Sequence, residues 1–155
     1  MTDLEDTGPT PATAAVRSRI VVGVDGSMLS RRALEWAVAE ARLRSAVVHV
    51  VTAWEYPAVV VGMEGTLDTR EIESGARHGQ SAALRRVAHD DVDVTSEVVQ
   101  GGAARVLVDA SAQADMLVVG SRGHGGFAGL MLGSVSSQVV HHSMCTVVVV
   151  RDRSH

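Results

Sequence analysis

The chain contains no lysine, so arginine supplies all 14 of its basic residues. Many phosphoryl-transfer sites place a lysine on the transferred phosphate, and Schiff-base enzymes need a lysine amine. The P-loop motif, Gly-x4-Gly-Lys-Ser/Thr, is absent as well. Phosphoryl transfer that uses a lysine, Schiff-base chemistry and phosphate binding by a P-loop are therefore excluded.

Several other residue classes are scarce. Aromatic residues make up 3% of the chain, so its core must be built from Val, Leu, Ala and Met. The single cysteine, Cys145, cannot form a disulfide within the chain, which favours a reducing compartment. No apolar run approaches the roughly 18 residues of a membrane span, and the N-terminal segment lacks the basic start and apolar middle of a signal peptide. We expect a cytoplasmic protein that does not contact a membrane.

Length and charge restrict the organisation and the partners. A chain of 155 residues predicts one domain with a sizeable core. Residues 1–17 are polar and acidic and contain Pro9 and Pro11, which predicts a flexible tail ahead of a folded domain over residues 18–155. The net charge of −4 provides no basic field, so no nucleic-acid partner is expected.

Short apolar runs alternate with helical patterns along the rest of the chain. This alternation predicts an α/β fold, with a parallel sheet covered by helices on both faces and a strand order of 3-2-1-4-5. Ser30 is a plausible N-cap of the first helix, and Asp68 or Thr69 of the second. Residues 55–67 predict a long loop. The predicted strands span 20–24, 47–53, 92–99, 116–119 and 146–150, and the predicted helices span 30–43, 68–88, 103–112 and 134–142.

The last predicted strand, Thr146–Val150, is apolar apart from its threonine and lies at a sheet edge. Exposed apolar edges are hazards that proteins pair or cover. Pairing with the same strand of a second copy would give a two-fold homodimer, which we favour. Coverage by the chain's own helices is the alternative.

The most informative motif is Gly120-Ser121-Arg122-Gly123, followed by nine residues and then Gly133-Ser134. It comes after a buried strand, and its second half begins a helix. Glycines let a backbone approach a ligand closely, and a helix N-terminus offers free N–H groups to an anion. The motif therefore predicts a phosphate-binding loop. Its alternatives are ordinary capping by Ser134 and a solvated Arg122.

Asp25 ends the first strand and is predicted to lie beside this loop. In open parallel sheets, ligands bind beyond the carboxyl ends of the strands where the strand order reverses. In the expected order, that point lies between the first and fourth strands. Asp25 could there accept from a ribose hydroxyl or an adenine amine, although a turn or cap aspartate is the alternative.

On these residues the chain resembles the universal stress protein family. The resemblance covers nearly everything after the tail, including residues 20–27, His49-Val50, Gly101 and the glycine motif through Ser136. It implies a Rossmann-like ATP-binding domain that is commonly dimeric through its last strand. It also implies that Asp25 and Val50 contact adenosine, and that ribose or phosphate contacts come from Gly120, Gly123, Gly133, Ser134 and Ser136.

The predicted ATP site combines the two loops with the strand ends that flank them. Mg²⁺ is a possible companion of ATP, but the seven histidines show no metal-ligand spacing and no metal-binding or catalytic residue is assigned. His124 is the histidine best placed near phosphates, and His49 is expected to be a satisfied core residue. The predicted site residues are Gly23, Val24, Asp25, Val50, Val119, Gly120, Arg122, Gly123, Gly133, Ser134, Val135 and Ser136.

Two functions remain open. The first is an ATP-binding stress-response regulator that acts as a nucleotide-dependent switch with slow or no hydrolysis, through a downstream protein partner that the sequence does not identify. The alternative is an enzyme that hydrolyses ATP or transfers a phosphoryl or nucleotidyl group. Efficient transfer needs a positioned base and charge neutralisation, and the sequence offers no clear base. We therefore favour binding, with at most weak ATPase activity.

Overall fold

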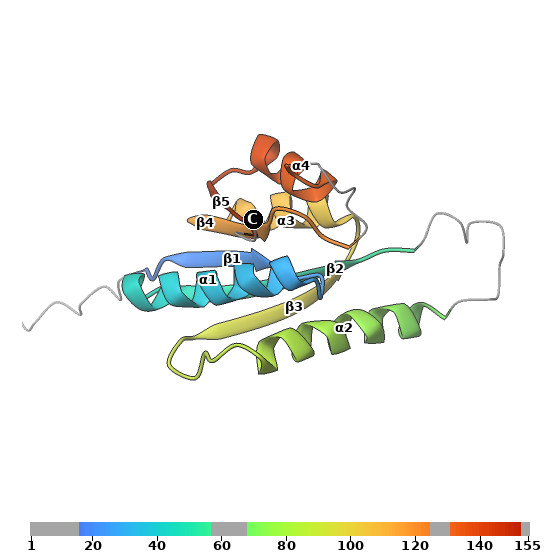
Figure 1. Cartoon of the computed structure of the whole chain (residues 1–155), viewed down its shortest axis with the longest axis horizontal. Coiled ribbons are helices and arrows are strands. Elements are labelled where there is room, and N and C mark those ends of the chain that lie inside the picture. Colours follow the sequence, from blue (N-terminus) through green and yellow to red (C-terminus); the bar gives the residue numbers. More distant parts are fainter. Residues whose placement is uncertain (1–15, 57–67, 125–130, 153–155) are drawn as a thin grey trace, which may run out of the picture.

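The computed structural model describes residues 16–56, 68–124 and 131–152. Residues 1–15 of the predicted tail and residues 57–67 of the predicted loop lie outside the described residues. Strands and helices alternate along the described chain, as the sequence predicted (Figure 1). The strands are β1 (Arg19–Gly23), β2 (Val47–Trp54), β3 (Val94–Gln100), β4 (Met116–Gly120) and β5 (Thr146–Val150), and the helices are α1 (Met28–Arg44), α2 (Thr69–Arg85), α3 (Ala103–Ser111) and α4 (Ser134–His142).

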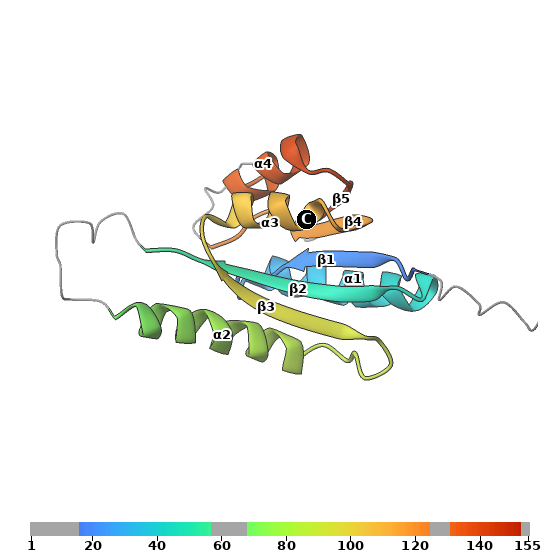
Figure 2. The same ribbon diagram turned by 180° about the vertical axis from the view of Figure 1, so that it is seen from behind.

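The strands form one parallel sheet in the order β3-β2-β1-β4-β5, which confirms the predicted topology. Helices α1 and α2 lie on one face of the sheet, and α3 and α4 lie on the other (Figures 1 and 2). The strand order reverses between β1 and β4, where Ile20 pairs with Met116 and Val22 with Val118. The carboxyl ends of these two strands therefore lie side by side.

The apolar strands form the middle layer of the fold. Successive side chains of a strand point to opposite faces, so Val22 packs in the cluster under α1 and α2, while Val21 packs in the cluster under α3 and α4. Both residues are completely buried. A strand buried on both faces needs a continuous apolar run, which is why these strands do not alternate in sequence.

Helix boundaries follow the capping side chains. The Ser27 hydroxyl accepts a hydrogen bond from Ser30 N at 3.2 Å, so α1 begins at Met28 and the predicted cap at Ser30 is wrong. Ser30 lies in the first turn, and its own hydroxyl donates to Ser27 O. The predicted cap at Asp68 is confirmed, because its carboxylate accepts from Arg70 N at 2.9 Å.

The two edges of the sheet differ. Strand β5 pairs with β4 on one side and carries partly buried valines after an exposed Thr146. Strand β3 forms the other edge and is more polar and more exposed. Pairing of β5 with a second copy stays a prediction. None of the helices in the described part of the chain is both long and apolar enough to cross a bilayer.

Candidate functional site

A cavity of about 300 Å³ opens at the carboxyl ends of β1 and β4. It lies at the reversal of strand order, where the topology predicted a ligand site. Every predicted site residue except Val50 lines it. Those residues are Gly23, Val24, Asp25, Val119, Gly120, Arg122, Gly123, Gly133, Ser134, Val135 and Ser136.

Val50 lies on the opposite face of the sheet. Its side chain is completely buried in the cluster under α1 and α2. Val51 follows it along β2, points to the other face and lines the cavity instead. Val51 O also accepts a hydrogen bond from Val24 N at 2.9 Å, which fixes the end of β1 against β2.

Asp25 is held at the rim of the cavity by the start of α1. Its Oδ1 accepts from Ser27 N at 2.9 Å, and its own N–H donates to Ser30 Oγ at 3.3 Å. Its Oδ2 points to the loop that follows β4, because a Cβ added to Gly123 would lie 2.5 Å from this oxygen. The two predicted loops therefore meet, and glycine at position 123 is what allows the close approach. Asp25 also has the role of a turn aspartate, which the sequence offered as the alternative, but only its Oδ1 takes part in that turn.

The surroundings of Asp25 favour its ionised form. Partial burial works against ionisation, but hydrogen bonds from Ser27 and Ser30 and the nearby His124 outweigh it, so the pKa of Asp25 is lowered from its ordinary 3.8. An ionised carboxylate only accepts hydrogen bonds. Its partner in a ligand is therefore a donor such as a hydroxyl or an amine.

Two hydrogen bonds tie together the halves of the glycine motif. Gly133 N donates to Ser121 O at 2.7 Å, and the Ser136 hydroxyl donates to the same oxygen at 2.8 Å. Gly133 O lies 3.1 Å from the Ser136 hydroxyl as a second acceptor. Ser136 is 2% exposed, and its hydroxyl has only one proton to give. In this geometry its hydroxyl closes the loop and is not free to donate to a ligand.

The start of α4 supplies backbone donors to the cavity. Its N-cap is Gly133, which makes no side-chain capping bond, and the first intrahelical bond runs from Ser137 N to Gly133 O at 3.0 Å. The N–H groups of Ser134, Val135 and Ser136 thus lack intrahelical acceptors. They carry the positive end of the helix dipole, so this end of the cavity suits an anion.

The walls between Asp25 and α4 are largely apolar and include residues that the sequence reasoning did not assign. Val51 and Ala53 come from β2, and Ala103 and Leu107 from α3. Gly23 brings β1 close to α3, since a Cβ there would lie 2.9 Å from a methyl of Leu107. The sequence predicted a helix over residues 103–112, but a helical pattern does not show that one helix face borders a cavity. Ser30 and His124 complete the lining.

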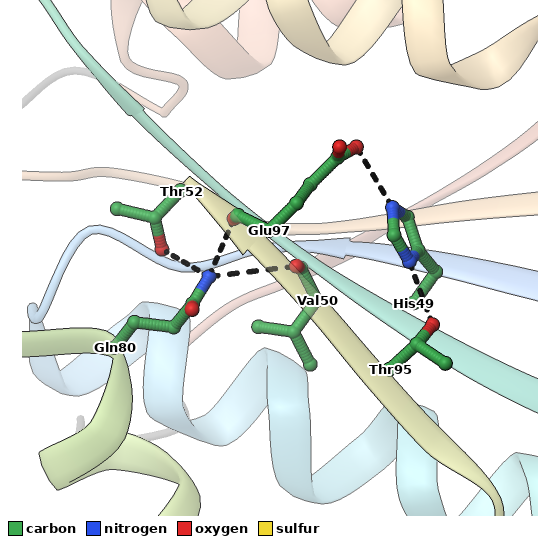
Figure 3. A network of polar contacts seen from close by, with 6 residues as sticks. All are labelled: His49, Val50, Thr52, Gln80, Thr95 and Glu97. Atoms are coloured by element: carbon green, nitrogen blue, oxygen red, sulfur yellow. Dashed lines mark hydrogen bonds and ion pairs between the residues drawn. The ribbon is translucent and has the colours of Figure 1, made fainter. Parts of the chain in front are cut away.

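His49 belongs to a separate polar network on β2 and β3, shown in Figure 3. Its Nδ1 lies 2.7 Å from Thr95 Oγ1 and its Nε2 lies 2.8 Å from Glu97 Oε1. On the other side of the sheet, Gln80 Nε2 donates to Thr52 Oγ1 at 3.1 Å and to Glu97 O at 2.7 Å (Figure 3). Both ring nitrogens of His49 have partners, which confirms the expected core histidine.

Comparison with known proteins finds the same family along nearly the whole chain. The model of the universal stress protein family matches residues 17–151. A universal stress protein of Mycobacterium tuberculosis is 38% identical over 134 residues, an alignment that covers 85% of this chain and 45% of the relative. A universal stress protein of Mycolicibacterium smegmatis is 36% identical and is covered to 49%. The chain therefore spans about half the length of these curated relatives.

Solved structures share the fold. The universal stress protein UspA from Lactobacillus plantarum superposes with a TM-score of 0.71 at 21% identity, over 88% of this chain and 99% of that one. A universal stress protein in complex with cAMP superposes with a TM-score of 0.57 at 30% identity, over 87% of this chain and 97% of that one. Sequence, topology and these likenesses agree, and the chain belongs to the universal stress protein family.

Proposed function

We propose that this chain binds ATP in the cavity between β1 and β4 and acts as a nucleotide-dependent switch with slow or no hydrolysis. One observation carries the proposal. An ionised Asp25 and the free N–H groups of α4 face the same cavity, on either side of the close approach at Gly123. A hydroxyl-bearing sugar joined to a phosphate group matches this pair of an acceptor and an anion site.

The lining suggests how the parts of the nucleotide are distributed. The adenine ring packs against the apolar wall that includes Val51 and Leu107. The ribose hydroxyls donate hydrogen bonds to Asp25. The phosphate oxygens accept hydrogen bonds from the N–H groups at the start of α4 and from the guanidinium of Arg122. Mg²⁺ arrives with the phosphates of ATP. The related structure with cAMP supports an adenine nucleotide as the class of ligand.

The same lining supports slow or absent hydrolysis. Among the described residues around the cavity, Asp25 is the only carboxylate, and its Oδ1 is already held by Ser27 N. Its low pKa makes it a weak base. An in-line attack by water needs a base beside the terminal phosphate, and in this assignment Asp25 lies at the ribose instead.

Calorimetry of ATP binding to the parent chain and to the variant Gly123→Ala tests the site. The added methyl displaces the Asp25 carboxylate that lies 2.5 Å from its position, so we expect affinity to fall at least about tenfold. Gly75→Ala is the matched control, because it adds the same methyl to α2 with nothing within 4 Å. The proposed site is overturned if the parent does not bind ATP, or if Gly123→Ala and Gly75→Ala bind ATP with equal affinity. Fast metal-dependent ATP cleavage in a single-turnover experiment would instead show that the chain is an enzyme that acts on ATP.

A further inference from the structure

We infer that Thr52 is a positioning residue that sets how strongly the site prefers nucleotides with ribose hydroxyls, because it fixes the peptide group that carries Asp25. This inference rests on the proposed function, in which Asp25 accepts hydrogen bonds from the ribose. The Thr52 side chain contacts α2 and lies on the face of the sheet opposite to Val51, which lines the cavity. Thr52 therefore acts on a ligand only through Asp25.

The Thr52 hydroxyl holds the carbonyl group that precedes Asp25. The register of β1 with β2 ends at Gly23 and Val51. One residue further on, the Thr52 hydroxyl donates a hydrogen bond to Val24 O at 2.7 Å. A carbonyl oxygen can only accept, so the direction of this bond is fixed. Thr52 is 5% exposed, which shields the bond from water.

The hydrogen bond that Thr52 accepts comes from α2. Gln80 Nε2 lies 3.1 Å from Thr52 Oγ1 and 2.7 Å from Glu97 O (Figure 3). The carbonyl of Glu97 requires a donor, which identifies the amide nitrogen of Gln80 and makes Thr52 Oγ1 its acceptor. The result is a one-way chain in which Gln80 donates to Thr52 and Thr52 donates to Val24 O. Both side chains are buried, and each bond in such a chain polarises the next.

The same peptide group is also held from its opposite edge. Val24 O and the N–H of Asp25 belong to one planar unit. Thr52 holds the oxygen, and the N–H donates to Ser30 Oγ at 3.3 Å. Two anchors on a rigid plane fix its orientation and the place of the Asp25 Cα. Loss of one anchor lets the plane tilt and shifts the carboxylate relative to the ribose, and hydrogen bonds weaken steeply when their geometry changes.

The test compares the calorimetric affinities of the full chain for ATP and for 2′,3′-dideoxy-ATP, an analogue without the ribose hydroxyls. We expect the parent to bind ATP about tenfold more tightly than the analogue, which is what one hydrogen bond to a charged acceptor contributes. Thr52→Val keeps the shape of the side chain but removes the hydroxyl, so this preference should fall to about twofold while affinity for the analogue stays unchanged. Thr52→Ser keeps the hydroxyl and should keep the parent's preference.

Two further variants test the chain of hydrogen bonds independently of Thr52→Val. Gln80→Leu removes the donor to Thr52 and should lower the preference for ATP in the same direction. Thr95→Val is the matched control, because it removes a threonine hydroxyl that lies 2.7 Å from His49 Nδ1 and not against the end of β1. Thr95→Val should keep the parent's preference.

Melting temperatures of the same proteins separate positioning from a structural role. A structural role alone would lower the melting temperature of Thr52→Val and leave its preference at the parent's value, which would overturn the inference. If Thr52→Val does not fold, an unchanged preference in Gln80→Leu overturns it instead. A parent that binds ATP and the analogue equally would also overturn it while nucleotide binding stands. Failure of the parent to bind either nucleotide would overturn the proposed function as well.

Discussion

Replacing Gly120 with alanine places a methyl group against the backbone of α1. Gly120 is the last residue of β4 and the first glycine of the motif. An added Cβ would lie 2.9 Å from the carbonyl carbon and 2.9 Å from the Cβ of Leu29, and 3.1 Å from its carbonyl oxygen. Backbone atoms cannot rotate away from the added methyl group, as the end of a flexible side chain can. Leu29 is buried in the first turn of α1, so relief requires the helix to shift from the sheet.

The magnitude follows from overpacking. Inserting a methyl group into a tightly packed interior costs about 1–3 kcal/mol, and contact with backbone puts this variant near about 2 kcal/mol. For a domain of this size, each kcal/mol lowers the melting temperature by about 2–4 °C, so we expect a loss of about 4–8 °C. Thermal melting followed by circular dichroism without nucleotide measures it, with urea unfolding as the second readout.

Gly75→Ala is the matched control for this measurement. Gly75 lies in α2, and a Cβ there meets nothing within 4 Å. Alanine is favoured over glycine in a helix by about 1 kcal/mol, so this variant should melt about 2–4 °C above the parent. The same chemical change thus has opposite signs at the two positions. A Gly120→Ala protein that melts at or above the parent temperature would refute the account of a rigid contact with Leu29.

Three further outcomes are expected. Gln80→Ala should lose about 1–3 kcal/mol of unfolding free energy in urea, because the buried acceptors Thr52 Oγ1 and Glu97 O lose their donor; His78→Ala, exposed on the same helix, should change little. Asp25→Asn should be less stable than the parent at neutral pH. A carboxyl with a lowered folded-state pKa stabilises the fold above its unfolded pKa. This difference should shrink as pH falls below 3.8 and be lost as pH falls through the lower folded-state pKa of Asp25, and urea titrations along a pH series would detect it. Sedimentation at tens of micromolar should find a dimer paired through Thr146–Val150, and a monomer alone would contradict that pairing.

The alternation of apolar runs and helical patterns was enough to predict the fold. Parallel strands need crossover helices, and helices on both faces demand strands that are apolar throughout. The predicted bounds of α4 and β5 agree with the structure residue for residue. The start of α1 was missed because Ser27 and Ser30 can both cap a helix, and only the hydrogen bond from Ser30 N shows which one does.

The candidate site was predictable where it depended on topology and not where it depended on side-chain direction. The meeting of Asp25 with Gly123 followed from the strand order. Val50 and Val51 differ by one position, which in a strand reverses the face. The resemblance pointed to Val50, whereas the side chain that lines the cavity is that of Val51. The engagement of Ser136 depends on a carbonyl 15 positions earlier in the chain, a distance that no local pattern encodes.

The bonds from Gly133 and Ser136 to Ser121 O also bear on how this protein can diversify during evolution. They fasten the stretch between positions 121 and 133 at its base, independently of what lies between. Doubling the length of such a closed segment adds only about 0.6 kcal/mol of entropic cost. Insertions and substitutions there can therefore alter what the protein recognises while the sheet and helices keep their stability.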